Sequence, residues 1–212
     1  MALRLENLVV SHAQNTLLKV NVCVKDGEIL TLMGPSGAGK STLLQAITGQ
    51  LNAPFSFSGI IKINGAVVND KAAHLRKVGI MFQDALLFEH MTVAENIAFA
   101  MPSDSHANRK AKMQAIDEML SAVDLKGIGE RAVTSLSGGQ QSRVSLLRTL
   151  ASEPDVVLLD EPFSKLDLAL REQIRSWTFV QLKARNIPAV LVTHDKEDAL
   201  AAGGQIIELS SC

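Results

Sequence analysis

The sequence is poor in aromatic residues, which make up 4% of its 212 residues, and it contains no tyrosine. Its two cysteines, Cys23 and Cys212, are far apart and have no histidine at metal-ligand spacing, so we expect neither a disulfide framework nor a zinc site. The 21 basic and 22 acidic residues nearly cancel, and this balance argues against nucleic acid as a partner. No apolar run reaches transmembrane length and the start lacks a signal-peptide pattern, so we expect a cytosolic chain.

Apolar residues, by contrast, make up 47% of the sequence and supply the core of one domain. Short apolar runs near the start predict strands, and Asn64-Gly65 predicts a two-residue hairpin turn because both turn positions need a positive φ. Apolar residues recur at helical spacing over 108–123, which predicts a helix. The runs 156–159 and 189–192 are short and rich in Val and Leu, and each leads into a helical pattern. Such runs are typical of buried parallel strands covered by helices.

One glycine-rich segment follows a predicted strand over 28–33, opens a predicted helix over 42–48, and matches the phosphate-binding pattern G-x-x-x-x-G-K-[ST]: Gly34-Pro35-Ser36-Gly37-Ala38-Gly39-Lys40-Ser41-Thr42. The glycines let backbone N–H groups turn inward onto a β-phosphate, and the helix N-terminus adds positive partial charge. We expect Lys40 to reach the β- and γ-phosphates and Ser41 to offer its hydroxyl to Mg²⁺. The pattern predicts nucleotide binding, but alone it leaves kinases, GTPases, helicases and transport ATPases open.

Two adjacent acids, Asp160 and Glu161, end the predicted strand over 156–159. Successive side chains on a strand point to opposite faces, so one carboxylate can face a metal ion while the other faces attacking water. We therefore expect Asp160 to bind Mg²⁺ through its water shell and Glu161 to act as the general base. Taken alone, the pair is equally compatible with an ordinary strand end.

The segment Leu136-Ser137-Gly138-Gly139-Gln140 matches the signature sequence of ABC ATPases and opens a predicted helix over 141–150. On its own, Ser137 is also compatible with a simple helix N-cap. Gln83 follows a predicted strand over 78–82, the loop 164–167 follows Glu161, and His194 follows a further strand. These motifs occur in the order of the family, so the whole chain resembles the ABC ATPases.

The resemblance implies two cassettes held head to tail, with each ATP and its Mg²⁺ enclosed between the phosphate loop of one cassette and the signature 137–140 of the other. Ser137 and Gly139 of the partner cassette would then meet the γ-phosphate. His194 would hold the γ-phosphate and orient Glu161, although a lone histidine after a strand is also compatible with a core position. Gln83 would contact the metal and sense the nucleotide, and Asp167 would couple the two sites.

The resemblance also implies a fold. It is an α/β phosphate-loop NTPase core with a mostly parallel sheet, an N-terminal antiparallel β subdomain and an inserted α-helical subdomain. We expect one domain over 1–212, in which 1–88 and 153–212 form the core and 89–152 the helical subdomain. The family commonly stacks an aromatic side chain, often Tyr, on adenine. Here His12 falls at the matching position, and its smaller ring predicts weak discrimination between ATP and GTP.

The segment Gln83–Met91 contains several apolar residues where cassettes of this family receive a helix of an integral membrane permease, although it is also compatible with buried core. The resemblance is nearest to the YnjD-type ATPase subunits of bacterial solute importers. It implies a place on the cytoplasmic face of the inner membrane, a second copy of the chain as partner, and a solute-binding protein reached through the permease. Alternatives are a soluble ABC ATPase that acts on a protein or nucleic-acid complex and a phosphate-loop kinase.

Overall fold

A computed structural model describes residues 2–103 and 108–209, so Cys212 lies outside the described residues. The chain forms two units: the first comprises the described part of Met1–Ile80, Pro154–Glu161 and Arg175–Cys212, and the second comprises Met81–Glu153 and Pro162–Ile174. The boundaries of these units differ from those of the expected subdomains, because residues 81–88, 153 and 162–174, expected in the core, belong to the second unit. The expected division of the sequence therefore stays a prediction.

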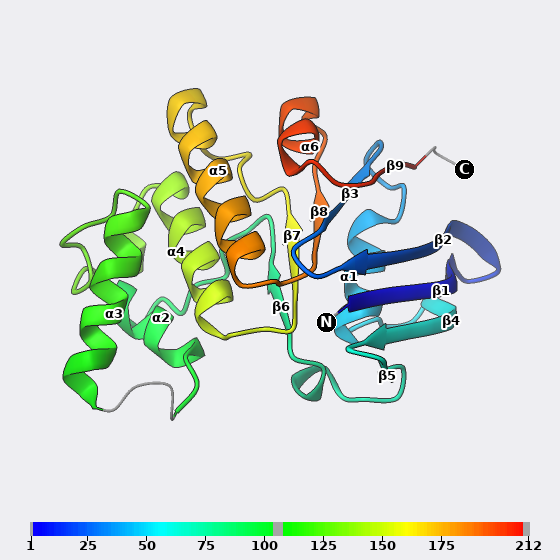
Figure 1. Ribbon diagram of the computed structural model, residues 1–212, viewed down its shortest axis with the longest axis horizontal. Coiled ribbons are helices and arrows are strands. Elements are labelled where there is room, and N and C mark those ends of the chain that lie inside the picture. Colours follow the sequence, from blue (N-terminus) through cyan, green and yellow to red (C-terminus); the bar gives the residue numbers. More distant parts are fainter. Residues whose placement is uncertain (1, 104–107, 210–212) are drawn as a thin grey trace. The chain divides into compact units, whose positions relative to one another are not determined.

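An antiparallel sheet opens the first unit, with the strand order β2 (Asn15–Lys25), β1 (Ala2–His12), β4 (Phe55–Ile63) and β5 (Ala66–Val67) (Figure 1). The predicted hairpin turn is confirmed, because Asn64 and Gly65 have φ angles of 52° and 80° between β4 and β5. β1 extends beyond the predicted apolar run 3–10 at both ends, and β4 begins before the predicted apolar run 60–68.

The alternation of core-facing and outward-facing side chains is interrupted once along β1. Leu3 and Leu5 are fully buried, and so are Leu8 and Val10, although Leu8 is three positions after Leu5 and strict alternation would put it on the opposite face. A β-bulge, where the register of β1 shifts between these two leucines, supplies the extra residue and keeps both pairs on the core side. Opposite the bulge, Gly59 has a φ of 99°, and a Cβ there would lie 2.5 Å from the carbonyl oxygen of Asn7.

The second sheet has the strand order β6 (Val78–Met81), β7 (Val156–Asp160), β8 (Ala189–Val192), β3 (Ile29–Met33) and β9 (Ile206–Glu208). The pairs β7–β8, β8–β3 and β3–β9 are parallel. Residues 156–159 and 189–192 are all buried, as their continuous apolar runs predict. Parallel strands place their carboxyl ends at one edge of the sheet, where the candidate site begins.

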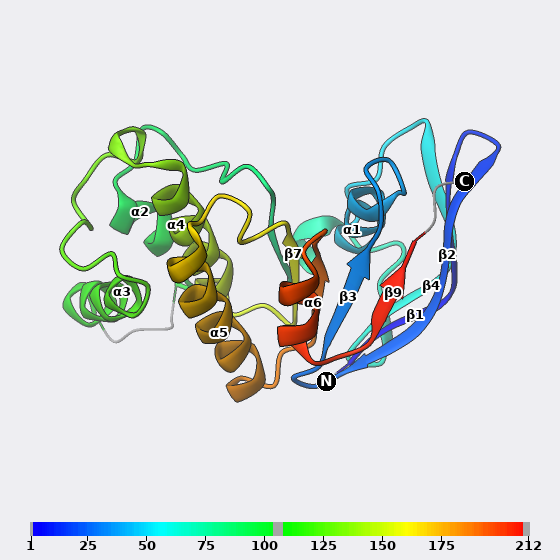
Figure 2. The same cartoon turned by 90° about the horizontal axis from the view of Figure 1, so that it is seen from above.

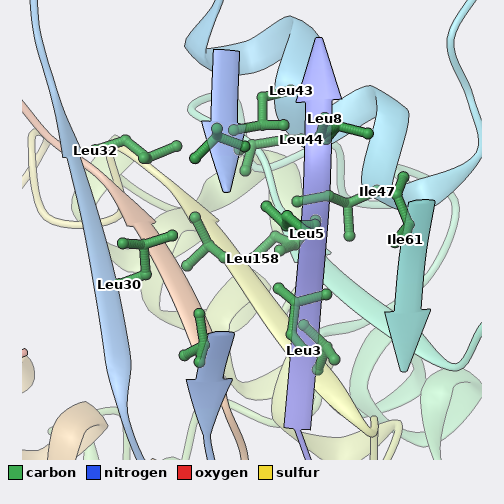
Figure 3. Packing of buried hydrophobic residues seen from close by; sticks show 14 of the residues in the cluster. Leu3, Leu5, Leu8, Leu30, Leu32, Leu43, Leu44, Ile47, Ile61 and Leu158 are labelled. Atoms are coloured by element: carbon green, nitrogen blue, oxygen red, sulfur yellow. The ribbon is translucent and has the colours of Figure 1, made fainter. Parts of the chain in front are cut away.

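Helix α1 (Lys40–Thr48) lies between β3 and the antiparallel sheet (Figure 2). Its apolar residues Leu43, Leu44 and Ile47 are almost fully buried in one hydrophobic cluster with side chains of both sheets (Figure 3). Helix α6 (Lys196–Ala202) follows β8 in the same unit. Each Å² of apolar surface removed from water stabilises the fold by about 25 cal/mol, so the burial of this cluster is the main source of stability for the unit.

Arg76 supports the far end of α1. Its guanidinium is buried and donates to the carbonyl oxygens of Ala46 and Ile47, both at 3.0 Å, in the last turn of the helix. Gly49 ends the helix with a φ of 78°, and a Cβ at this position would lie 2.6 Å from the guanidinium. Arg76 therefore adds donors to carbonyl groups of the last helical turn, where the Ala46 carbonyl also accepts from the Gly49 N–H, and the positive φ and close approach favour glycine at position 49.

The second unit contains α2 (Val93–Ala100), α3 (Arg109–Ala122), α4 (Gly138–Ala151) and the first part of α5 (Leu168–Ala184). The helix predicted over 108–123 is confirmed, with Asn108 as its N-cap. Helix α4 begins earlier than the predicted 141, because Ser137 and Gln140 form a capping box. None of the helices in the part of the chain that the structure describes has both the length and the apolar character needed to cross a bilayer.

Candidate nucleotide-binding site

The predicted phosphate loop connects β3 to α1 in the first unit. Gly34, Gly37 and Gly39 all have positive φ angles, of 146°, 85° and 83°. A Cβ on Gly34 would lie 2.5 Å from the carbonyl oxygen of Leu209, so the backbone also passes too close there for a side chain. Gly39 is the N-cap of α1 and has no side-chain oxygen to accept from the first N–H groups of the helix. These donors and the helix dipole suit the loop to an anion.

Lys40 and Ser41 begin α1 and turn toward different partners. The Lys40 Nζ donates to the carbonyl oxygens of Gly34 and Pro35 at 2.6 and 2.8 Å. The Ser41 hydroxyl donates to Oδ2 of Asp160 at 2.9 Å, so the phosphate loop meets the end of β7. Burial raises the pKa of the Asp160 carboxyl, while the hydrogen bond from Ser41 and the charge of Lys40 oppose that rise.

A hydroxyl and a carboxylate side by side are ligands that Mg²⁺ prefers. In the described residues, no three His, Cys, Asp or Glu side chains gather into a group able to hold a metal ion by themselves. Ser41 and Asp160 therefore have oxygens that would suit a Mg²⁺ ion, which at nucleotide sites is usually held by one or two carboxylates together with substrate phosphates.

Glu161 and His194 meet at the same edge of the parallel sheet. Glu161 follows β7 with a φ of 50°, and its N–H donates to the carbonyl oxygen of Val192 at the end of β8. The Nδ1 of His194 lies 2.8 Å from Oε1 of Glu161. Thus Asp160, the last residue of β7, contacts Ser41, while Glu161, in the turn that follows, contacts His194, so the two adjacent acids have different partners.

The signature residues and Asp167 lie in the second unit. The Ser137 hydroxyl accepts from the Gln140 N–H at 3.3 Å, and the Gln140 Oε1 accepts from the Ser137 N–H at 3.0 Å. Ser137 and Gly138 are exposed, and Gly139 is half-buried against the loop 164–167. Asp167 caps α5, because its Oδ1 accepts from the Leu170 N–H at 3.1 Å. The N-termini of α4 and α5 are thus both exposed in this unit.

Gln83 is exposed and also belongs to the second unit, directly before Asp84. The Oδ1 of Asp84 lies 2.8 Å from Nζ of Lys165, and this hydrogen bond lowers the pKa of the Asp84 carboxyl. The contact joins the Gln83 segment to the loop 164–167 within the unit. Sequence reasoning missed this pair because 81 residues separate its members.

His12 is exposed at the end of β1 and pairs across the sheet with Phe55, the first residue of β4. The centroids of the two rings are 4.9 Å apart, and the rings are tilted by 51°. Sequence reasoning proposed His12 and missed Phe55. The alternation of Phe55 and Phe57 with serines was the signal that could have extended the predicted strand to this residue.

The segment Gln83–Met91 is partly exposed in the second unit. Leu86 is 61% exposed, and Phe88 contacts Phe99 of α2, which is 65% exposed, with ring centroids 5.0 Å apart. Arg148 of α4 donates to the carbonyl oxygens of Leu86 and Ala85 at 2.8 and 3.0 Å and lies 5.7 Å from the centroid of the Phe88 ring. The sequence indicated the apolar segment but not Phe99 or Arg148, which come from other helices.

A phosphate loop between a parallel strand and a helix, together with a Ser–Asp pair and a carboxylate–imidazole pair, defines a phosphate-loop NTPase. A family model described as ABC transporter matches residues 17–164. The chain therefore belongs to the ABC transporter family, and it is an ATP-binding cassette and an ATPase. The predicted α/β fold class is confirmed, with its antiparallel and parallel sheets and its helices.

The chain is 44% identical to the uncharacterized ABC transporter ATP-binding protein YnjD of Escherichia coli K12, over 87% of this chain and 84% of YnjD. It is 40% identical to the sulfate/thiosulfate import ATP-binding protein CysA of Synechocystis, over 100% of this chain but 59% of CysA. Among solved structures, a dimeric ATP-binding cassette in a post-hydrolysis state bound to ADP and Pi has a TM-score of 0.83 at 28% identity. That match covers 99% of this chain and 96% of the other.

Proposed function

We propose that two copies of this cassette enclose and hydrolyse ATP, and that they drive solute import through a membrane permease. The observation that carries the proposal is the meeting of the phosphate loop with Asp160 at one sheet edge, next to the Glu161–His194 pair. The exposed start of α4 at Ser137 offers N–H donors and a positive dipole end to an anion. The dimeric cassette that this chain resembles supports a paired arrangement.

Within one cassette, Lys40 would leave its two loop carbonyls and reach the β- and γ-phosphates. Mg²⁺, when bound, supplies positive charge that neutralises the phosphates during transfer. Ser41 and Asp160 would hold the ion, and Gln83 would contact it. Glu161 would accept the proton of the attacking water.

His194 would orient Glu161 through the 2.8 Å contact and hold the γ-phosphate with its other ring nitrogen. From the second cassette, Ser137, Gly138, Gly139 and Gln140 would complete the γ-phosphate site. Asp167 would couple the two sites through the start of α5. Neither cassette alone would then contain a complete site.

The exposed apolar patch of Leu86, Phe88 and Phe99 supports docking of a permease at the segment Gln83–Met91. Docking there would hold the cassette at the cytoplasmic face of the inner membrane as a peripheral subunit. An apolar patch rimmed by polar groups is typical of a surface that meets another protein. The similarity to the CysA proteins, which are sulfate/thiosulfate import ATP-binding proteins, supports import. Those names describe the relatives' solutes, and specificity in such systems lies in the permease and its solute-binding protein.

Phe99→Asp is expected to weaken capture of the permease by about tenfold or more, because a charge replaces an exposed aromatic side chain of the patch. The measurement is the amount of integral membrane protein that co-purifies with the tagged chain from detergent-solubilised membranes. Leu200→Asp is the matched control, because Leu200 is 73% exposed on α6 of the other unit. Equal capture of the permease by both variants would contradict the proposal that the permease docks at this patch. Capture of a soluble protein or nucleic-acid complex instead would favour a soluble ABC ATPase.

GTP is expected to be hydrolysed at a rate comparable with that of ATP. The proposed base contact is the imidazole of His12, which offers less stacking surface than a phenol ring. Stacking contacts the face of the base and does not distinguish the edge of adenine from that of guanine. The measurement is kcat/KM for both nucleotides, side by side, for the wild type and His12→Tyr. The larger ring of His12→Tyr should lower KM for both nucleotides. A strong preference of the wild type for ATP over GTP would contradict the prediction.

A further inference from the structure

A buried ion pair lies beside the loop that carries His194. Asp198, in the first turn of α6, is 1% exposed, and its Oδ1 lies 3.0 Å from Nη1 of Arg175 on α5. Its Oδ2 accepts a hydrogen bond of 3.3 Å from the hydroxyl of Thr193, which is fully buried. Thr193 directly precedes His194, so the ion pair is one residue away from the exposed imidazole.

The Thr193 hydroxyl fixes the loop on both sides of His194. It donates to Asp198 and accepts from the N–H of Asp195 at 3.1 Å. Asp195 in turn caps α6, because its Oδ1 accepts from the N–H of Glu197 at 2.7 Å. A hydroxyl can donate and accept at once through its single oxygen atom. The backbone of residues 193–195 is thereby held at both ends while the His194 side chain stays free to meet Glu161.

Stability alone is a poor explanation for this arrangement. A buried ion pair contributes little net stability compared with apolar side chains of the same volume. In the described part of the chain, moreover, Nε of Arg175 is buried with no hydrogen-bond partner, which is a cost to folding. What the pair does supply is a fixed direction for the Asp198 carboxylate, and through it a fixed place for Thr193.

We propose that Arg175, Asp198 and Thr193 are positioning residues that hold His194 in place for ATP hydrolysis. They act through the loop 193–195 and touch neither nucleotide nor metal. The inference rests on the proposed role of His194, since positioning matters only if the imidazole takes part in the reaction. A displacement of about 1 Å at a catalytic group costs up to roughly 10²-fold in rate, so a loosened loop should be visible in turnover.

Thr193→Val and Thr193→Ser form the first test. Valine fills the site and removes the hydroxyl, while serine keeps it. We expect Thr193→Val to lower kcat by about 10- to 100-fold with little change in the dissociation constant for ATP, and Thr193→Ser to recover most of the loss. Steady-state turnover, calorimetric titration with ATP and the melting temperature of each variant give these values. Leu200→Ala is the control and should leave kcat unchanged, because Leu200 is 73% exposed on α6.

A double-mutant cycle with His194→Ala separates positioning from a general loss of structure. If Thr193 acts through His194, Thr193→Val lowers kcat in the wild type and has no further effect on His194→Ala. A purely structural role would lower kcat by the same factor in both backgrounds, and this outcome would overturn the inference. Should Thr193→Val fail to fold, Asp198→Asn takes its place in the cycle, because the amide keeps an oxygen for Thr193 but removes the charge that faces Arg175.

The cycle also separates this inference from the proposed function. If His194→Ala turns over ATP as fast as the wild type, the proposed role of His194 fails, and the positioning inference fails with it. If His194→Ala is slow but a folded Thr193→Val is as fast as the wild type, only the positioning inference fails.

Discussion

Glu161→Gln is expected to slow ATP hydrolysis by roughly 10²- to 10⁴-fold, the usual contribution of a positioned base, while ATP binding is kept. The amide has nearly the shape of the carboxylate, so the turn after β7 and the hydrogen bond from the Glu161 N–H to the end of β8 should persist. What is lost is the ability to accept a proton from water. The Asp160–Ser41 contact is separate and should keep its Mg²⁺ ligands.

Because hydrolysis is blocked after binding, Glu161→Gln should accumulate an ATP-bound dimer that size-exclusion chromatography separates from the monomer. Turnover of inorganic phosphate and elution volume with ATP and Mg²⁺ are the two measurements. Glu172→Gln, on the exposed face of α5, is the matched control and should turn over normally as a monomer or a transient dimer. A persistent Glu161→Gln monomer with normal turnover would refute both the base assignment and the paired arrangement.

The sequence predicted the phosphate loop well because the requirements of that loop are local. Gly34, Gly37 and Gly39 have positive φ angles, which glycine adopts with little strain. The strand, the loop and the helix also follow one another directly in the sequence. The same holds for the Asn64-Gly65 turn. The buried strands 156–159 and 189–192 were predictable because a continuous apolar run of that length suits a strand covered on both faces.

Other features were hidden because they depend on contacts between distant parts of the chain. The bulge in β1 restores the burial of Leu8 and Val10, but the sequence shows only that the alternation breaks. Phe55 meets His12 only because two antiparallel strands pair in one register. The Arg175–Asp198 ion pair joins α5 to α6, and nothing near either residue indicates its partner.

The sequence proposed members of the candidate site but gave no information on their contacts. Pattern and family order indicated Ser41, Asp160, Glu161 and His194, while folding adds that Ser41 pairs with Asp160 and Glu161 with His194. The parallel sheet makes this pairing, because neighbouring strands end at one edge. The signature residues contact each other and the loop 164–167 within their own unit. Their proposed role toward ATP depends on a second chain, which no pattern in one sequence can place.

Lys40→Ala is expected to act before hydrolysis, by weakening ATP binding itself. The ammonium group is the charge that the phosphate loop directs at the β- and γ-phosphates. A hydrogen bond to a charged group is worth about 1.5–3 kcal/mol, which corresponds to a rise in the dissociation constant of roughly 10- to 100-fold. Calorimetric titration with ATP and Mg²⁺ measures this change, with Lys19→Ala, an exposed lysine on β2, as the control.

The contacts of Lys40 with Gly34 and Pro35 raise a second explanation for such a loss, because the side chain also holds its own loop. If the loop collapses without the lysine, the melting temperature in the absence of nucleotide should fall as well. Both backbone carbonyls are near solvent, so water can replace the lysine, and we expect that temperature to change little. Weaker binding with an unchanged melting temperature thus assigns Lys40 to the phosphates, and normal ATP binding by Lys40→Ala would contradict the role given to the loop.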